Sequence, residues 1–310
     1  MPNQFRTSVI ARGPVTAEGL AQDVNSLFDG RGGPAYRIGR AQAAPVRSPV
    51  HSFVTGIPSA VPSVRGMRIV VIGGTGLIGT WMVRILRAGG HDVAAHSLST
   101  GLDLRSEKGL PQALNGADVV VNLTNSPTYD RAAPVFFRET TENLLLAAED
   151  AEVGHLVTLS VVGAERVPRL PYFRAKVLQE DLIEAGPVPF SIMRATQTFE
   201  LVEAMLPPAA SGPTVRLPAT ALQPLAAKEV AWMLATVSAG EPLEGIRDVA
   251  GPEVLTLAEV AQATLSARGD NRTVVTGGDA GLFAAVPGDE LLADAGATIA
   301  PTTLEQWLGR

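Results

Sequence analysis

The feature that most restricts the fold of this chain is a glycine-rich stretch between a short β-branched segment, 68–72, and a helical pattern, 77–87. Glycines at this spacing allow a sharp turn out of a strand, a close approach of backbone to a phosphate, and tight packing of helix on strand. The start of the helix also presents free N–H groups with a partial positive charge. The sequence therefore predicts a site for the pyrophosphate of a dinucleotide, with a tight turn that binds nothing as the alternative. The residues of this site are Gly73, Gly74, Thr75, Gly76, Leu77, Ile78 and Gly79.

Beyond this turn, segments with the apolar pattern of strands alternate with segments that have the apolar pattern of helices. Short, strongly apolar segments predict strands at 68–72, 92–96, 118–123, 155–162 and 190–194. Helical patterns separate them, at 77–87, near 110–114, at 134–149 and at 173–185. Because strands that alternate with helices form parallel sheets with right-handed crossovers, we expect an α/β fold with a doubly wound parallel sheet.

The chain divides into three parts by composition and pattern. Residues 1–66 are rich in Pro, Gly, Ala and Arg without a sustained period, which predicts a poorly ordered extension in which a short helix near 16–28 is possible. Residues 67–200 are expected to form a nucleotide-binding domain. Residues 201–310 are expected to form a smaller C-terminal substrate lobe, packed on the first domain, with which it can share strands. Apolar candidates for its pocket or its core are Phe199, Leu201, Met205, Leu217, Phe283 and Trp307.

The composition excludes several classes of protein. Cysteine is absent, which removes disulfides and thiolate nucleophiles, and with four scattered histidines no metal site is expected. The net charge of −6 argues against nucleic-acid binding, and no apolar run is long enough to cross a membrane. We therefore expect a cytoplasmic protein that acts on a small-molecule substrate; the sequence is compatible with an oligomer.

The stretch after the second expected strand bears on the choice between NAD and NADP. Sites that prefer NAD place Asp or Glu there, where it binds the ribose hydroxyl. This chain has no carboxylate between residues 94 and 100 and offers His96, Ser97 and Ser99, which can accommodate a 2′-phosphate. The sequence therefore favours NADP(H) over NAD(H). Asp103 and Leu104, taken to follow a third strand, are expected beside the adenine.

A tyrosine and a lysine four residues apart are the candidate catalytic groups. Tyr172 and Lys176 stand at the start of an expected helix, where positions i and i+4 share one face. An ammonium and an oxidised nicotinamide would lower the pKa of the phenol from about 10, so that it can exchange a proton with a carbonyl or alcohol. Ser160, at the end of the strand 155–162, can hydrogen-bond the same oxygen. The alternative is a helix start with a packed tyrosine and a solvated lysine.

Together these segments resemble the short-chain dehydrogenase/reductase superfamily, and in particular its atypical, NmrA-like branch. The resemblance rests on the glycine turn, on Asp103-Leu104, on the strand that ends in Ser160, and on the stretches YFRAKVLQEDLIEAG and PFSIMRATQTFE. It covers nearly all of 67–310 and none of 1–66. It implies a Rossmann fold that binds NAD(P)(H), with Ser160, Tyr172 and Lys176 in the active site and Lys176 at the nicotinamide ribose.

The resemblance also implies two sets of polar residues around the nicotinamide, for which loop capping is the alternative role. One set stands at the end of the strand 118–123 and just after it, and consists of Asn122, Thr124 and Asn125. The other follows the strand 190–194 and consists of Ala195, Thr196 and Gln197. Two functions follow from the resemblance. One is an NAD(P)H-dependent oxidoreductase for a small carbonyl, quinone or alcohol, and the other is a catalytically silent NADP(H) sensor that signals to a protein partner. In the first, Lys176 becomes the main acid/base if Tyr172 points away.

Overall fold

The computed structural model describes residues 66–206, 212–277, 283, 286 and 288–309. Within these residues the main feature is a seven-stranded parallel sheet in the order β11-β8-β5-β4-β3-β1-β2. Its strands are β1 (Arg68–Ile72), β2 (Asp92–His96), β3 (Val119–Asn122), β4 (His155–Val161), β5 (Phe190–Ala195), β8 (Gly245–Ala250) and β11 (Thr298–Ile299). The extension expected at residues 1–66 lies outside the described part of the chain, apart from Gly66.

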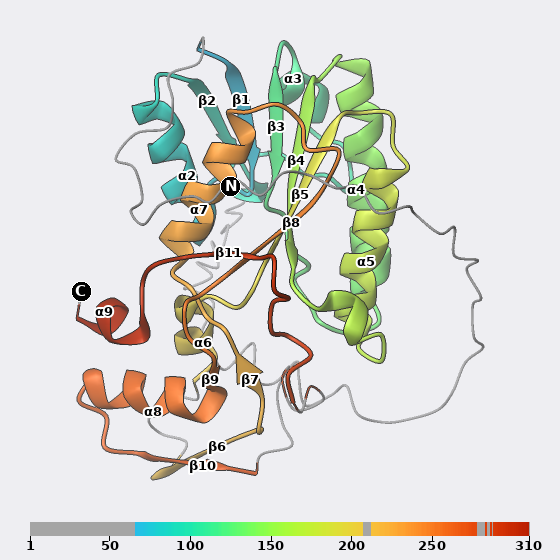
Figure 1. Ribbon diagram of the computed structural model, residues 1–310. Coiled ribbons are helices and arrows are strands. Elements are labelled where there is room, and N and C mark those ends of the chain that lie inside the picture. The colour runs from blue at the N-terminus through green and yellow to red at the C-terminus, as the bar shows by residue number, and fades with distance from the viewer. Residues whose placement is uncertain (1–65, 207–211, 278–282, 284–285, 287, 310) are drawn as a thin grey trace, which may run out of the picture.

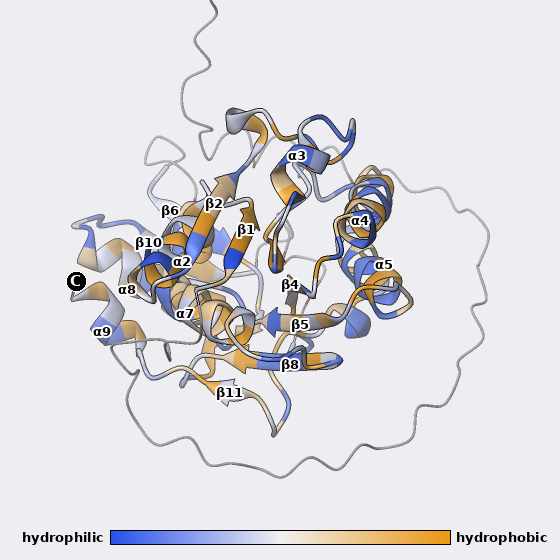
Figure 2. Cartoon of the chain, turned by 90° about the horizontal axis from the view of Figure 1, so that it is seen from above, coloured by the Kyte–Doolittle hydropathy of each residue, from blue (hydrophilic) through white to orange (hydrophobic). Residues whose placement is uncertain are grey.

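The sheet is doubly wound, as the sequence predicts. From β1 the chain moves outward to β2 and then returns to the other side of β1 to form β3, so strand order reverses between β1 and β3. Helices α2 (Leu77–Ala88) and α7 (Ala227–Ser238) cover one face, and α4 (Ala133–Asp150) and α5 (Pro171–Glu184) cover the other (Figures 1 and 2). The short helix α3 (Leu110–Leu114) extends the second layer.

Strands that are apolar on both faces explain why both faces are covered. Val70 and Val71 are adjacent on β1 and point to opposite sides, and both are fully buried. Val71 belongs to the core under α2 and α7, together with Met82 and Leu234. Val70 belongs to the core under α3, α4 and α5. The expected α/β class is therefore confirmed.

A smaller set of elements lies beyond the carboxyl ends of the strands (Figure 1). It consists of α6 (Phe199–Ala204), β6 (Thr214–Leu217), β7 (Ala221–Leu222), β9 (Leu255–Thr256), α8 (Leu257–Ala267), β10 (Thr273–Thr276) and α9 (Leu304–Leu308). The expected pocket candidates Phe199, Phe283 and Trp307 are buried in a third core here, where Phe199 and Trp307 stack with centroids 5.2 Å apart. Because β8 and β11 belong to the central sheet, the segment after residue 200 contributes to both layers.

Two local expectations differ from the structure. The third strand expected before Asp103 does not form, and Asp103 makes only an isolated bridge with Lys108. Residues Leu98–Thr100, just before it, form a short 3₁₀ helix, and Gly101 has a φ of 93°, so the chain is not extended there. Helix α5 begins at Pro171 and not at residue 173, so Tyr172 lies inside its first turn. Within the described residues, no helix is long and apolar enough to cross a membrane.

A buried histidine links the amino ends of β4 and β5. Nε2 of His155 lies 2.8 Å from Oγ of Ser191, which also accepts a hydrogen bond from the backbone N–H of Leu243 at 2.9 Å. Burial lowers the pKa of His155 to about 4, so the folded protein holds it uncharged. An unfolded chain binds a proton at this residue below about pH 6.5, and the folded chain does not until about pH 4.

The contribution of His155 to stability is therefore expected above about pH 6.5 and lost as the pH falls towards 4. Urea unfolding of wild type and His155→Gln between pH 4.5 and 7.5 measures it. Because other groups titrate in both proteins, the difference isolates His155, with a slope approaching about 1.4 kcal/mol per pH unit. Parallel stability curves for the two proteins would contradict a neutral buried histidine.

Candidate functional site

The glycine turn is held between the ends of three strands. The backbone N–H groups of Gly73 and Gly74 both donate to the carbonyl of His96 at the end of β2, at 2.8 and 3.2 Å. Gly73 has a φ of 83°, and a Cβ added to it would lie 3.0 Å from the carbonyl oxygen of Leu123, just after β3. The turn therefore lies where strand order reverses, which is where open α/β sheets bind ligands.

The last glycine brings helix α2 against the turn. A Cβ at Gly79 would lie 2.3 Å from the carbonyl oxygen of Gly73, closer than real side chains approach backbone. Gly76 caps the helix without a side-chain hydrogen bond, and Thr75, Gly76 and Leu77 are exposed. The helix thus presents uncapped backbone N–H groups at the reversal point, an arrangement that fits a pyrophosphate.

The polar residues expected on the adenosine side gather after β2. Oγ of Ser97 lies 2.8 Å from Oγ of Ser99, and the backbone N–H of Ser97 donates to Thr100 Oγ1 at 2.8 Å. Burial, and secondarily the positive charge of Arg68, lower the pKa of His96. His96 is therefore uncharged at neutral pH, and it offers a ring N–H and not a full positive charge to a ligand phosphate.

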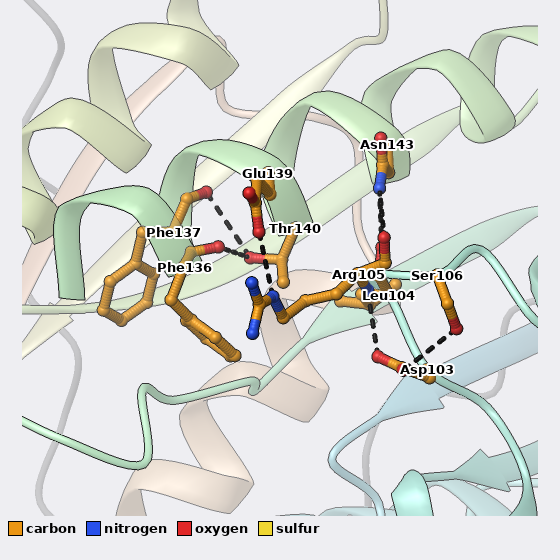
Figure 3. A network of polar contacts seen from close by, with 9 residues as sticks. All are labelled: Asp103, Leu104, Arg105, Ser106, Phe136, Phe137, Glu139, Thr140 and Asn143. Carbon is orange, nitrogen blue, oxygen red and sulfur yellow. Dashed lines mark hydrogen bonds and ion pairs between the residues drawn. The ribbon is translucent and has the colours of Figure 1, made fainter. Parts of the chain in front are cut away.

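The loop that carries Asp103 and Leu104 is tied to α4 (Figure 3). The carboxylate of Asp103 accepts hydrogen bonds from the backbone N–H of Arg105 and the hydroxyl of Ser106, and these bonds lower its pKa. The carbonyl of Leu104 accepts a 2.8 Å hydrogen bond from Asn143 Nδ2, and Arg105 Nε lies 2.9 Å from Glu139 Oε2. The loop is thus held by hydrogen bonds within the protein itself, and Asn143 is a positioning group that the sequence analysis missed.

Residues at the end of β3 and just after β5 include buried polar atoms without a partner. Asn122 accepts a 3.0 Å hydrogen bond from the backbone N–H of Thr124, while its Nδ2 has no partner among the described residues. Thr196 donates to the carbonyl of Gln223 at 2.6 Å, whereas Oε1 of the buried Gln197 is unpaired within the same described part. Buried polar groups normally find a partner. These two are therefore fit to bind a polar ligand group at this edge.

Lys176 is buried, with 2% of its surface exposed. Its Nζ donates to the carbonyl of Leu159 on β4 at 2.8 Å and to Oε1 of Gln179, and lies 4.8 Å from the ring centroid of Phe137. Burial lowers the pKa of Lys176 to about 8, although the negative charge of Glu180 raises it. The ammonium is thus held at a fixed point beside β4 with its proton easier to remove than usual.

Tyr172 is enclosed by aromatic rings. Tyr129, Phe137 and Phe173 all contact it edge to face, with centroid separations of 4.9 to 6.1 Å. Its hydroxyl donates to Asn125 Oδ1 at 3.0 Å. Burial raises the pKa of the phenol, and the neighbouring Tyr129 adds to that, while the hydrogen bond to Asn125 lowers it. The sequence suggests that the ammonium of Lys176 lowers the pKa of this phenol, but Lys176 is not among the groups that shift it.

Ser160 lies next to the residue that holds Lys176. It follows Leu159 on β4, is 2% exposed, and its Oγ has no partner among the described residues. The structure thus links Lys176 to β4 directly beside Ser160, and links Tyr172 to Asn125. The sequence analysis missed Gln179, although a position three residues after a helical lysine is a natural place for its partner.

Comparison with known proteins bears on the fold. No protein-family model and no curated protein sequence matches this chain. Among solved structures, UDP-glucose 4-epimerase of Thermus thermophilus in complex with NAD is 21% identical, with a TM-score of 0.59, over 79% of this chain and 94% of that one. The dTDP-4-dehydrorhamnose reductase of Bacillus anthracis in complex with NADP is 14% identical, with a TM-score of 0.57, over 78% and 93%.

A third structure shows the same architecture. An NAD-dependent NDP-hexosamine 5,6-dehydratase is 17% identical, with a TM-score of 0.59, over 79% of this chain and 98% of that one. The likeness spans nearly the whole length of these proteins and more than three quarters of this chain, so the chain shares their fold. At such low identity the likeness establishes the fold alone.

The contact between Gly79 and Gly73 predicts a measurable cost for one added methyl group. Gly79→Ala is expected to lower the free energy of unfolding by about 1–3 kcal/mol, because its Cβ would meet rigid backbone. Urea unfolding checks this. Gly296→Ala is the matched control, since a Cβ there meets nothing within 4 Å, and its stability should stay within about 0.5 kcal/mol of wild type. Equal stability of the two variants would contradict the tight packing at the turn.

Proposed function

We propose that this protein is an NADP(H)-dependent oxidoreductase of the atypical, NmrA-like short-chain dehydrogenase/reductase type, acting on a small carbonyl, quinone or alcohol. The observation that carries the proposal is Lys176, a buried ammonium whose hydrogen-bond partners in the described part of the chain are neutral, at the edge of the sheet where the glycine turn lies. Buried, pKa-shifted lysines of this kind gather at functional sites. The structures with this fold that contain NAD or NADP support the cofactor class.

The chain's own residues suit the proton half of such a reaction. A bound NADPH would supply the hydride. For a carbonyl substrate the oxygen must then gain a proton, from Tyr172 or from Lys176, while Ser160 Oγ hydrogen-bonds that oxygen. Lys176 has the more accessible pKa, about 8, whereas burial raises that of the phenol. This difference favours Lys176 as the main acid, with Tyr172 joining if the cofactor's charge lowers its pKa.

The second candidate is a nucleotide sensor that binds NADP(H) without turnover and reports to a protein partner. The packing of Tyr172 favours it: the phenol is buried among three rings and its hydroxyl is engaged by Asn125. A phenol held in this way contributes to the core and does not need to meet a substrate.

Steady-state turnover separates the two functions. Wild type is expected to oxidise NADPH with at least one member of a panel of small aldehydes, ketones and quinones. Lys176→Met should lower kcat/KM by about 10²- to 10⁴-fold, since it removes the proton donor and keeps most of the side-chain volume. Lys108→Met is the matched control, because Lys108 is exposed, and should leave kcat/KM unchanged. Tight NADPH binding with no turnover of any panel member would establish the sensor.

The preference for NADP rests on the residues after β2. No carboxylate stands there to repel a 2′-phosphate, and the paired hydroxyls of Ser97 and Ser99 can donate to one. Ser97 precedes the short 3₁₀ helix Leu98–Thr100 as its cap residue. Asp and Asn both serve well as helix caps, so either can replace Ser97 without loss of the local fold.

Ser97→Asp is expected to weaken NADPH binding by about tenfold or more and to leave NADH binding unchanged or tighter, because a carboxylate repels the 2′-phosphate and accepts from a free ribose hydroxyl. Ser97→Asn, which is neutral and similar in shape, is the control and should change neither affinity as much. Calorimetric titration with both cofactors measures the ratio. An unchanged ratio in Ser97→Asp would place the 2′-phosphate elsewhere.

A further inference from the structure

Helix α5 brings two possible partners to the buried ammonium. Gln179 and Glu180 follow Lys176 by three and four residues, so both lie near its face of the helix. All three side chains are buried. A lysine and a glutamate four residues apart commonly pair, and a buried ammonium gains most from a carboxylate. Here the partner of Lys176 is the neutral Gln179.

Arg194 on β5 explains why Glu180 is not the partner. Its Nε donates to Glu180 Oε1 at 3.0 Å and its Nη2 donates to Oε2 at 2.6 Å, so both carboxylate oxygens are engaged. Nη1 of the same guanidinium lies 3.4 Å from Glu165 Oε2, in the segment after β4. Burial lowers the pKa of Arg194, but the pairing with Glu180, helped by Glu165 and Asp248, outweighs this and raises the pKa above its usual value, which keeps Arg194 charged.

The other elements around Lys176 bring no competing charge within the described residues. Helix α4 contributes the ring of Phe137, and its paired charged residues Arg138 and Glu142 are about half exposed. Strand β4 contributes the carbonyl of Leu159, and Tyr172 and Tyr129 contribute neutral phenols. Asp248 on β8, next to Arg194 in the sheet, faces that guanidinium. Glu180 is therefore the carboxylate that acts on Lys176.

We propose that Arg194 is a positioning residue that engages both oxygens of Glu180 and so leaves Lys176 anchored by Gln179 and the carbonyl of Leu159. A neutral anchor holds the ammonium in place without stabilising its charge as a carboxylate would. The bidentate geometry requires a guanidinium, because a lysine ammonium at position 194 cannot make both bonds in the same plane. The importance of this arrangement for catalysis rests on the proposed function of Lys176, whereas the pairing of Arg194 with Glu180 and its effect on the pKa of Lys176 do not.

The scarcity of lysine makes the proposal directly measurable. The only lysines in the chain are Lys108, Lys176 and Lys228. Full-length protein labelled with ¹³C at the lysine side-chain terminus gives one resonance for each, and Lys→Arg variants at positions 108 and 228 assign them. The titration midpoint of the Lys176 resonance then reports its environment with no need for substrate or cofactor.

Arg194→Gln is expected to raise the Lys176 midpoint by about one pH unit or more, because Glu180 becomes free to pair with the ammonium. Arg194→Lys should shift it in the same direction by less. Adding Glu180→Gln to Arg194→Gln should bring the midpoint back to the wild-type value or below it. This double variant also removes both members of the buried pair, which spares the fold an uncompensated charge.

Arg138→Gln is the matched control, since it breaks an ion pair on the exposed side of α4, and it should leave the Lys176 midpoint in place. An unchanged midpoint in both Arg194→Gln and Arg194→Lys would overturn the proposal, as would a raised midpoint that persists in the double variant. A shifted midpoint in a protein that turns nothing over would support the positioning role of Arg194 and contradict the proposed oxidoreductase. Turnover in wild type, together with a Lys176 midpoint that does not move in the Arg194 variants, would support the proposed oxidoreductase and contradict the positioning role of Arg194.

Discussion

The close approach of helix α2 to the turn before it is the constraint on which the site depends. Gly79 leaves no room for a side chain between the helix and the carbonyl of Gly73, and the N–H groups of Gly73 and Gly74 bind the carbonyl of His96. These contacts fix the start of the helix at the point where strand order reverses. The uncapped N–H groups therefore meet the loops from β2, β3, β4 and β5 at one edge, because all parallel strands end there.

The residues around this edge differ in how firmly they are held. The loop at Asp103 is bonded to α4, and Lys176 is bonded to β4, so both are organised by the protein itself. Ser160, Asn122 and Gln197 instead retain buried polar atoms with no partner in the described part of the chain. A site of this kind separates the groups that shape it from the groups left to receive a ligand. The two proposed functions share the binding half and differ only in whether Lys176 and Tyr172 move a proton.

Much of the architecture could be predicted from local patterns. The strand at 68–72, the glycine turn and the alternation up to residue 195 lead to a parallel sheet because apolar period and glycine spacing act over a few residues. The prediction of a strand before Asp103 was wrong, because Leu98–Thr100 form a 3₁₀ helix and Gly101 has a positive φ angle. The environments of Tyr172 and Lys176 could not be predicted, since they depend on Asn125, Leu159 and Phe137, which reach them only through packing.

The sequence by itself determined the turn, the order of the elements, and the presence of a tyrosine and a lysine on one helix. Only the tertiary structure decided that the phenol is packed among rings, that Gln179 holds the ammonium, and that Glu180 is bonded to Arg194 from another strand. The physical reason is the distance along the chain over which each interaction acts. Backbone conformation and apolar period are set by neighbours along the chain, whereas desolvation and ion pairing depend on every element that packs around a group.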